Sequence, residues 1–223
     1  MIKINTFESY NELSNSLIDL LVSNFELPNS IMLSGGKTPY DIYNKIAKLK
    51  PRVNKECKLF LSDERYVKAN SEDNNAYNLL NMLNKLNCHS NFIPVNTALD
   101  ANSVAQDYGK KINAITPIKI GLLGIGQDGH TAGIFSNKDA ISSYKSPTFI
   151  SKRPNGILGI SVSNYFIQKI EKIILLAVSN NKKDILTTLL NNPTTIPAGL
   201  ILSKHSNVEI WTDVKLDINS NIL

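Results

Sequence analysis

A glycine-rich turn near the middle of the chain carries an acid and an imidazole close together. The segment Gly124-Ile125-Gly126-Gln127-Asp128-Gly129-His130 follows an apolar run that predicts a buried strand. An isolated histidine is more often a hydrogen-bonded structural residue than a catalyst. A glycine turn, however, has little apolar cover to offer a structural histidine. Asp128 and His130 are therefore candidates for acid–base chemistry.

The same turn has the GxGxxG spacing of dinucleotide-binding loops, which makes a nucleotide cofactor an alternative. Two features argue against it. The turn lies in mid-chain and lacks a clear acidic residue at a second strand end about 20 residues further on. It also ends in Asp-Gly-His, which places an acid and an imidazole on the turn itself. We therefore expect no cofactor and interpret the turn as part of a catalytic site.

A second glycine turn, Ser34-Gly35-Gly36-Lys37-Thr38-Pro39, follows a strand predicted at residues 31–33. Glycines let backbone N–H groups approach a ligand closely, and a helix N-terminus favours an anion. Lys37 adds a positive charge, so the turn is a candidate phosphate cradle; the alternative is an ordinary strand-to-helix turn. The GxxxxGK[ST] spacing of a P-loop is absent. We expect Thr38 to cap the next helix and Pro39 to take its first position.

Three consecutive charged residues, Asp63-Glu64-Arg65, follow a strand predicted at residues 58–62. Such a run is often only a solvated loop. A functional role is favoured here because ligands of open α/β sheets bind at the carboxyl ends of the strands. We expect this run to lie beside the turn that begins at Ser34, on the same edge of the sheet.

Other catalytic and metal-binding patterns are poorly represented. The sequence holds neither a GxSxG nucleophile elbow nor an HExxH zinc motif. Asp128 and His130 alone do not make a metal site, so no metal is expected. No serine stands out as a nucleophile, which makes water the expected attacking group. His89 and His205 lie in polar contexts and are assigned no function.

Short apolar runs alternate with amphipathic helical patterns along the chain. Further strands are predicted at residues 118–123, 159–162, 173–178 and 208–211. Helices are predicted at residues 13–25, from Thr38, from a cap at Asp100 to about residue 115, and at residues 182–190. This alternation is typical of the α/β class, with a mostly parallel, Rossmann-like sheet and helices on both faces. Because no linker or repeat interrupts the pattern, residues 1–223 are expected to form a single domain.

The composition is that of a globular protein whose charge suits an anionic small molecule. Of the 223 residues, 42% are hydrophobic and 19% charged, and the formal net charge is +5. No cluster of Lys and Arg with interleaved aromatics occurs, so nucleic acid is not an expected partner. The longest aliphatic run, residues 173–178, is too short to span a bilayer, and no membrane interaction is expected. Two cysteines outside any CxxC pair and the lack of an apolar leader predict a cytoplasmic protein. We expect a monomer or weak homodimer.

The motifs, in their order along the chain, resemble the 6-phosphogluconolactonase branch of a family shared with glucosamine-6-phosphate deaminases. The matching stretches run from about Ile31 to Asp213 and read LSGGKTPYDIY, FLSDERYV followed by NAYNLL, GLLGIGQDGHTAGIF, and IPAGLI. The resemblance implies a sheet-centred α/β fold. It also implies a sugar-phosphate substrate and hydrolysis of the δ-lactone of 6-phosphogluconate, a step of the oxidative pentose phosphate pathway.

By the same resemblance, His130 is the base that activates water and later returns the proton to the departing ring oxygen. Asp128 or Asp63 orients the imidazole or orders the water. Arg65 stabilises the oxyanion or holds the phosphate, and the sequence does not choose between these roles. The resemblance places these residues in substrate binding: Ser34, Gly35, Gly36, Lys37, Thr38, Gly126, Arg153 and Lys182.

The chain departs from the lactonase pattern at positions related to the substrate phosphate. Lys37 stands where lactonases usually have a serine, and Ile157 stands where they have an arginine thought to help bind phosphate. Ser179 or a neighbour replaces a glycine that precedes the family's later lysine. If the arginine is absent, another cation must make up its charge. We expect Lys37 to do so, with Lys182 and Arg153 as the other candidates.

Two other functions remain open. The deaminases place an Asn-Glu-Pro shortly after the histidine segment, and that acid takes part in ring opening and isomerisation of an amino sugar. Residues 131–138 contain no acid, and family deaminases tend to lack the arginine found at position 65, so the lactonase branch is favoured. A non-catalytic regulator that binds sugar phosphates would keep the turn at Ser34 but would not need Asp128 and His130.

Overall fold

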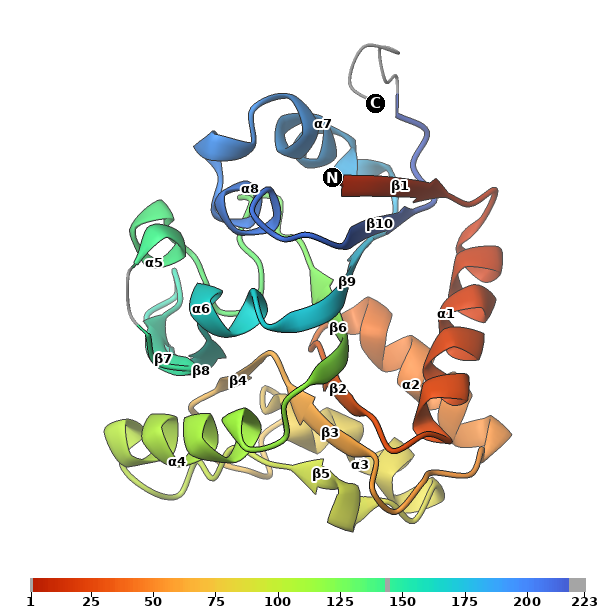
Figure 1. The fold of residues 1–223 in the computed structure, drawn as a ribbon, viewed down its shortest axis with the longest axis vertical. Helices are drawn as coiled ribbons and strands as arrows, with labels where there is room; N and C mark the ends of the chain where they lie inside the picture. Colours follow the sequence, from red (N-terminus) through yellow and green to blue (C-terminus); the bar gives the residue numbers. More distant parts are fainter. Residues whose placement is uncertain (1, 143–144, 217–223) are drawn as a thin grey trace.

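A computed structural model describes residues 2–142 and 145–216 and shows a central sheet with helices on both faces (Figure 1). The strands of this sheet are β1 (Ile2–Thr6), β2 (Ser30–Leu33), β3 (Lys58–Leu61), β5 (Phe92–Ile93), β6 (Ile118–Gly124), β9 (Ile170–Ala177) and β10 (Val208–Thr212). Across the described sheet they lie in the order β1-β10-β9-β6-β2-β3-β5, and every neighbouring pair is parallel. The parallel sheet expected from the sequence is confirmed.

A smaller antiparallel sheet lies beside the main one. It is formed by β4 (Asp63–Arg65), β8 (Leu158–Val162) and β7 (Thr148–Lys152), in that spatial order. The described helices are α1 (Tyr10–Phe25), α2 (Lys37–Leu49), α3 (Asn75–Lys85), α4 (Ala101–Asn113), α5 (Asn137–Ile141), α6 (Asn164–Ile167), α7 (Lys183–Asn191) and α8 (Pro197–Leu202). Short 3₁₀ turns occur at His89–Asn91, Asn180–Lys182 and Pro193–Thr195.

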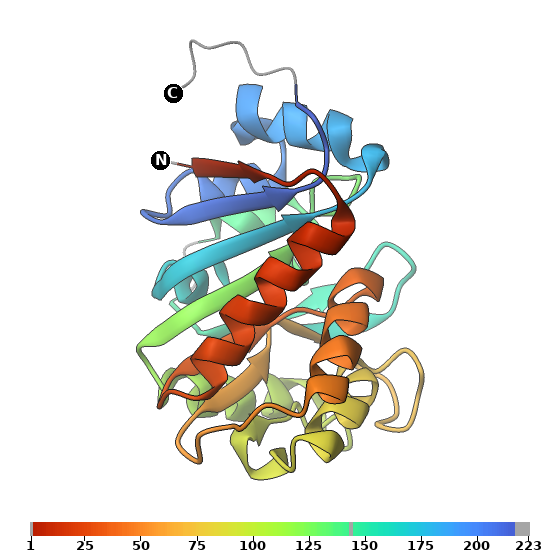
Figure 2. The same ribbon diagram turned by 90° about the vertical axis from the view of Figure 1, so that its right-hand side faces the viewer.

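The main sheet separates two apolar cores, because successive side chains of a strand point to opposite faces. In β2, Ile31 and Leu33 belong to one core and Met32 belongs to the other. Helices α1, α2 and α3 complete the first core, whereas α4, α6, α7 and α8 complete the second. Figure 1 shows α1 and α2 on one side of the sheet and α5, α6 and α8 on the other, and Figure 2 shows α1 crossing the sheet face.

The chain changes direction across the sheet at β2 and β6, which are neighbours. From β2 it continues to β3 on one side, whereas from β6 it continues through the smaller sheet to β9 on the other. The segment after β2 enters the first core through α2, and the segment after β6 enters the second core at Ile134. The two loops therefore diverge, which opens a crevice at the carboxyl ends of the strands, where open α/β sheets bind ligands.

All six strands predicted from the apolar runs are present, although β9 begins at Ile170 rather than Ile173. The sequence pattern does not predict β1, β4, β5 or β7. Strand β5 has two residues, and β4 is the charged run Asp63-Glu64-Arg65, which has the composition of a loop. That run becomes a strand because it pairs with β8, a segment far away in the sequence.

Helix boundaries follow the predicted caps in one case and not in another. Asp100 caps α4, accepting a hydrogen bond from the N–H of Ser103 at 3.0 Å. The cap predicted at Thr38 is wrong, because α2 begins at Lys37 with Gly36 as its N-cap. Gly36 has φ 115°, a conformation readily adopted only by glycine, so the chain turns into the helix two residues early.

Helix α3 is absent from the sequence-based prediction because its segment, NAYNLLNMLNK, is rich in asparagine, a weak helix former. Its Leu79, Met82 and Leu83 are nevertheless buried in the first core, so tertiary packing stabilises the helix. Within the described ranges, no helix has the length and apolar character that crossing a membrane requires.

Candidate active site

A pocket of about 270 Å³ opens at the carboxyl ends of β2, β3 and β6. The two glycine turns and the residues after β3 form its walls, as expected from the parallel sheet. It brings together these predicted site residues: Ser34, Gly35, Gly36, Asp63, Arg65, Gly126, His130, Arg153 and Lys182. The lining residues that sequence reasoning missed are Ser62, Asn75, Gly124, Ile125 and Ala132.

Three predicted site residues lie outside this lining. Asp128 is bonded to His130 and reaches the pocket through it. Lys37 and Thr38 line an adjoining hollow of about 190 Å³ that shares Lys182 with the pocket. The side chain of Lys37 is exposed.

The imidazole of His130 is held at one of its two nitrogens. Nδ1 lies 2.5 Å from Oδ1 of Asp128, and the backbone N–H of His130 donates to the same oxygen at 3.3 Å. An acceptor at Nδ1 favours the tautomer with its proton there, which leaves Nε2 to accept a proton. Burial acts to raise the pKa of Asp128, but the hydrogen bond and charge of His130 outweigh it and hold that pKa below its ordinary value. Asp128 is therefore a carboxylate that orients the imidazole of His130.

The turn after β6 accommodates this imidazole because residue 126 is glycine. A Cβ on Gly126 would lie 2.1 Å from Nδ1 of His130 and 2.3 Å from Oδ1 of Asp128. The N–H of Gly126 donates to the carbonyl of His130 at 2.9 Å and closes the turn. Gly129, at φ 80°, reverses the chain and accepts a hydrogen bond from the N–H of Ala198 at 2.9 Å. His130 is thus carried on a turn fixed by backbone hydrogen bonds at Gly126 and Gly129.

The glycine turn after β2 begins at a pocket residue, Ser34, whose buried hydroxyl has no partner among the described residues. Ser34 is 4% exposed, and no described residue bonds its Oγ. Buried polar groups nearly always have a partner, so this hydroxyl favours a polar ligand at the turn. The hydroxyl of Tyr43 fixes the Ser34 backbone, accepting from its N–H at 3.2 Å and donating to its carbonyl at 3.0 Å. Gly35 passes so close to Asn75 that a Cβ would lie 2.7 Å from the amide.

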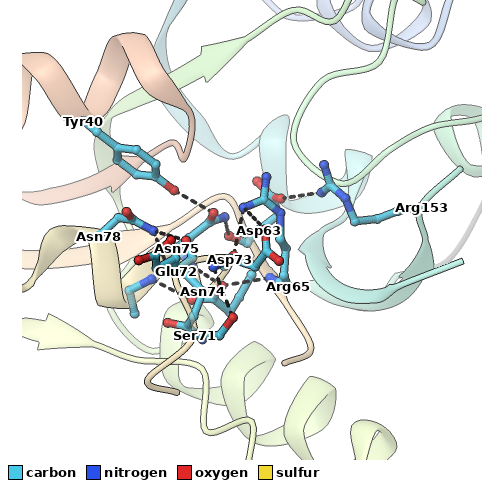
Figure 3. Close-up of polar contacts among 12 residues, drawn as sticks. Tyr40, Asp63, Arg65, Ser71, Glu72, Asp73, Asn74, Asn75, Asn78 and Arg153 are labelled. Atoms are coloured by element: carbon cyan, nitrogen blue, oxygen red, sulfur yellow. Dashed lines mark hydrogen bonds and ion pairs between the residues drawn. The ribbon is translucent and has the colours of Figure 1, made fainter. Parts of the chain in front are cut away.

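Two arginines that line the pocket come from the ends of the two edge strands of the smaller sheet, β4 and β7 (Figure 3). Arg65, at the end of β4, donates from Nη1 to the carbonyl of Asp73 at 2.8 Å. Arg153, in the turn after β7, places Nη1 3.6 Å from Oδ2 of Asp63. Asp63 is itself fixed by the hydroxyl of Ser62, which donates to its Oδ1 at 2.9 Å. The arginines therefore stand close to an acid without a tight bidentate pair, and their donors remain available to a ligand.

Lys182 supplies a third cation from the other side of the pocket. Its Nζ donates to the carbonyl of Ile125 at 2.7 Å. Burial lowers the pKa of Lys182, and the charge of Asp128 opposes this effect. Among the described lining residues, Asp63 is the one carboxylate, so the pocket is suited to an anion. Among the residues that the structure describes, no group of three or more His, Cys, Asp or Glu side chains is arranged to hold a metal ion.

Comparison with known proteins identifies the family. The sequence profile described as glucosamine-6-phosphate isomerases/6-phosphogluconolactonase matches residues 11–211. The chain belongs to this family. The match includes both glycine turns and the charged run that forms β4.

Similar members of the glucosamine-6-phosphate isomerase/6-phosphogluconolactonase family come from both of its branches. A 6-phosphogluconolactonase of Thermotoga maritima is 31% identical, covering 80% of this chain and 81% of the relative. A glucosamine-6-phosphate deaminase of Clostridium novyi is 32% identical, covering 95% and 97%. The solved 6-phosphogluconolactonase of Leishmania guyanensis superposes with a TM-score of 0.81 at 21% identity, covering 95% and 96%, which shows the fold. Overall identity therefore does not separate the branches.

Two departures from the family's lactonase pattern can be located in the structure. Ile157 lies across the β7–β8 hairpin from Arg153, whose N–H donates to the Ile157 carbonyl at 2.9 Å. Of these two residues, Arg153 lines the pocket and Ile157 does not. A cation is thus present on the other side of the turn that joins β7 and β8. Ser179 has φ 75°, a conformation that favours glycine, which agrees with the expectation that Ser179 or a neighbour replaces the family's glycine.

A buried glutamate supports the side of the pocket that carries Asp63 and Arg65. The Glu64 carboxylate accepts hydrogen bonds from the backbone N–H groups of Asn75 at 2.6 Å, Ala76 at 2.8 Å and Arg65 at 2.8 Å. Asn75 and Ala76 are the first residues of α3, whose N–H groups have no partner within the helix. Glu64 therefore joins β4 to the start of α3.

Asn75 extends this junction into the pocket (Figure 3). Its Nδ2 donates to the carbonyl of Asp63 at 2.8 Å, and its Oδ1 accepts from the hydroxyl of Tyr40 at 2.7 Å. It thereby links α2, β4 and α3. The matching NAYNLL stretch marked this segment in the sequence, but no local signal showed which of its residues faces the pocket.

We expect Glu64→Gln to change how stability depends on pH. Burial raises the pKa of Glu64 to about 7, against the opposing effect of the three N–H groups that donate to it. A carboxyl group whose pKa is raised on folding stabilises the protein most below its ordinary value of 4.5 and loses that contribution as the pH rises through about 7. The free energy of unfolding of the wild type, relative to Glu64→Gln, should fall by about 2 kcal/mol between about pH 5 and about pH 8.

Urea unfolding of both proteins at the two pH values measures this difference. Asp100→Asn is a suitable control, because Asp100 also caps a helix but lies at the surface. A difference between wild type and Glu64→Gln that stays constant with pH would contradict the prediction.

Proposed function

We propose that this chain hydrolyses 6-phospho-D-glucono-1,5-lactone to 6-phosphogluconate, a step of the oxidative pentose phosphate pathway. The observation that carries the proposal is that His130, oriented by Asp128, shares one pocket with Arg65, Arg153 and Lys182. Lactone hydrolysis requires a base for water and donors for the oxyanion, and the substrate phosphate requires a cation. The pocket offers all three.

In the proposed reaction, Nε2 of His130 takes a proton from water while the water oxygen bonds to C1 of the lactone. The carbonyl oxygen becomes an oxyanion, and the bond between C1 and the ring oxygen then breaks. The protonated His130 returns its proton to that ring oxygen, so that the products are a carboxylic acid and a hydroxyl group. Asp128 stabilises the imidazolium during this cycle, and Asp63 is placed to order the water.

The two arginines are assigned different parts of the substrate. Arg153 stands on the hairpin where the family pattern has its phosphate-binding arginine, across from Ile157. We therefore assign Arg153 to the phosphate, together with Lys182 and the turn at Ser34. Arg65 is then the cation left for the oxyanion. A preorganised donor of this kind contributes roughly 3–4 kcal/mol to transition-state stabilisation, as measured by its removal.

The deaminase branch is the alternative, because a deaminase is as similar in overall sequence. The first acid after His130 is Asp139, and its Oδ2 accepts a hydrogen bond from the hydroxyl of Ser136 at 2.7 Å at the start of α5. Asp139 lines a different hollow from His130. An acid committed to a helix start cannot assist ring opening in the pocket, which favours the lactonase.

A cytoplasmic location is part of the same proposal. Cys57 and Cys88 are free and buried, which is typical of proteins in a reducing compartment. The proposal also treats residues 1–223 as one domain that acts as a monomer or weak homodimer on a small sugar phosphate.

The first test compares the two branch activities directly. We expect lactone hydrolysis well above the spontaneous rate, measured with freshly made 6-phosphogluconolactone and a coupled assay for 6-phosphogluconate. We expect no ammonia release from glucosamine 6-phosphate, because Asp139, the first acid after His130, is bonded at the start of α5 and lines a different hollow. Ammonia release faster than lactone hydrolysis would assign the chain to the deaminase branch, and sugar-phosphate binding without either reaction would identify a regulator.

The second test removes the base. His130→Ala should lower kcat by about 10²-fold or more, the usual effect of losing a general base. His130→Asn should behave alike, since it keeps polarity but has no basic nitrogen. His205→Asn is the matched control, because His205 lies far from the pocket and bonds the carbonyl of Ile170. Near-normal turnover by a folded His130→Ala protein would exclude the role.

The third test locates the phosphate cation. Arg153→Ala should raise KM for the phosphorylated lactone about tenfold or more, because a charge-assisted hydrogen bond is worth roughly 1.5–3 kcal/mol. Turnover of unphosphorylated gluconolactone should barely change. Lys37→Ala should have the smaller effect, since Lys37 is exposed in the adjoining hollow. If Lys37→Ala raised KM more than Arg153→Ala did, the phosphate would be assigned to the adjoining hollow instead. If Arg153→Ala affected both substrates equally, Arg153 would not belong to the phosphate site.

A further inference from the structure

Phe135 contacts both the assigned base and the assigned phosphate cation. Its ring centroid lies 4.5 Å from that of His130, at an interplanar angle of 38°. The guanidinium carbon of Arg153 lies 4.9 Å from the same centroid. The ring is half-buried, does not line the pocket and, among the described residues, packs onto neither apolar core. It therefore contacts two side chains that line the pocket without being part of the lining itself.

We propose that Phe135 is a positioning residue that holds His130 and Arg153 at a fixed separation across the pocket. The proposal rests on the lactonase function, because that reaction gives the two side chains their roles. Phe135 is not among the residues that line the pocket, so in this proposal it acts through its two neighbours.

The polar contacts of His130 and Arg153 do not by themselves hold either side chain in one orientation. Asp128 holds His130 at Nδ1, but the side chain of Asp128 is 54% exposed, and one hydrogen bond leaves the plane of the imidazole free to tilt. Arg153 has one ion pair, at 3.6 Å, with Asp63. A ring packed against the imidazole restricts its tilt, and the same ring attracts a guanidinium through its quadrupole. Phe135 thus supplies a restraint that each of them lacks.

The segment before Phe135 is well suited to fix the ring. The hydroxyl of Thr131 donates to the carbonyl of Gly124 at 2.8 Å, which ties the segment to the end of β6. The N–H of Gly133 donates to the hydroxyl of Ser161 at 3.0 Å, which ties it to β8. A Cβ at Gly133 would lie 2.7 Å from Cβ of Ser161, so the two backbones are in close contact. Phe135 therefore follows a segment anchored to the end of β6, which precedes the His130 turn, and to β8, which pairs with the strand that precedes Arg153.

The kinetic test replaces the ring while keeping an apolar side chain. Phe135→Leu should lower kcat about tenfold, because the base is no longer held in line, and should raise KM about fivefold, because Arg153 is released. Phe135→Tyr keeps the ring and should stay within about twofold of wild type in both constants. Phe149→Leu is the matched control, since Phe149 is also half-buried but packs onto the second core. If Phe135→Leu does not fold, Phe135→Met provides a ringless side chain of similar volume.

The double variant shows whether Phe135 acts through its neighbours. In an Arg153→Ala background, Phe135→Leu should lower kcat as before but raise KM no further, because the cation it held is gone. If Phe135 only filled space, Phe135→Leu would instead raise KM by the same factor in the wild-type and the Arg153→Ala backgrounds. That result, or kinetics of Phe135→Leu like those of Phe149→Leu, would overturn the proposal.

A measurement without turnover separates this proposal from the lactonase assignment. The ring of Phe135 should shift the imidazole proton resonances of His130, and Phe135→Leu, but not Phe149→Leu, should remove the shift. Titration with 6-phosphogluconate should show affinity about fivefold weaker for Phe135→Leu and unchanged for Phe135→Tyr. If the wild type hydrolyses no lactone, the proposed function fails while these measurements still report on Phe135. Unchanged His130 resonances and unchanged affinity in Phe135→Leu would refute the positioning role.

Discussion

The hydrogen bonds accepted by the buried carboxylate of Glu64 are the interaction on which the side of the pocket with Asp63 and Arg65 depends. This carboxylate lies at the meeting point of β4, which pairs with β8, and of α3, whose first N–H groups it binds. Because Glu64 is 1% exposed, those bonds form where water does not compete. Their consequence is geometric: the residues on either side, Asp63 and Arg65, are directed toward the pocket while Glu64 is directed away from it.

A parallel sheet explains why segments far apart in sequence meet in this pocket. The glycine turns follow β2 and β6, two neighbouring strands from which the chain departs toward opposite sides of the sheet. The smaller sheet then brings Arg153 to the same place from the far end of the β7–β8 hairpin. His130 lies on a turn closed by glycines, and the cations lie on separate elements around it. Such a site can bind charge on one side and move a proton on the other.

Family membership leaves the reaction to be decided by individual residues. A lactonase and a deaminase are about equally similar to this chain, so the deciding feature is the use of each acid. Asp128 bonds the histidine, Asp63 faces the pocket, and Asp139 is bonded at the start of α5. Arg153 lies across the β7–β8 turn from Ile157, the position at which the resemblance leads us to expect an arginine. Phe135 contacts both Arg153 and His130.

The sequence by itself determined the parallel α/β fold, the six apolar strands and most of the pocket residues, because each depends on local patterns: apolar periodicity, glycine turns and charges at strand ends. Tertiary structure decided what local patterns do not encode. The run Asp63-Glu64-Arg65 became a strand through pairing with a distant segment, and asparagine-rich α3 became a helix through burial and the Glu64 carboxylate. Lys37 carries the right charge in the right loop, yet the early start of α2 leaves it exposed beside the pocket. Asn75 and Phe135 gain their roles from contacts with residues distant in sequence, and such contacts depend on the packing of the whole chain.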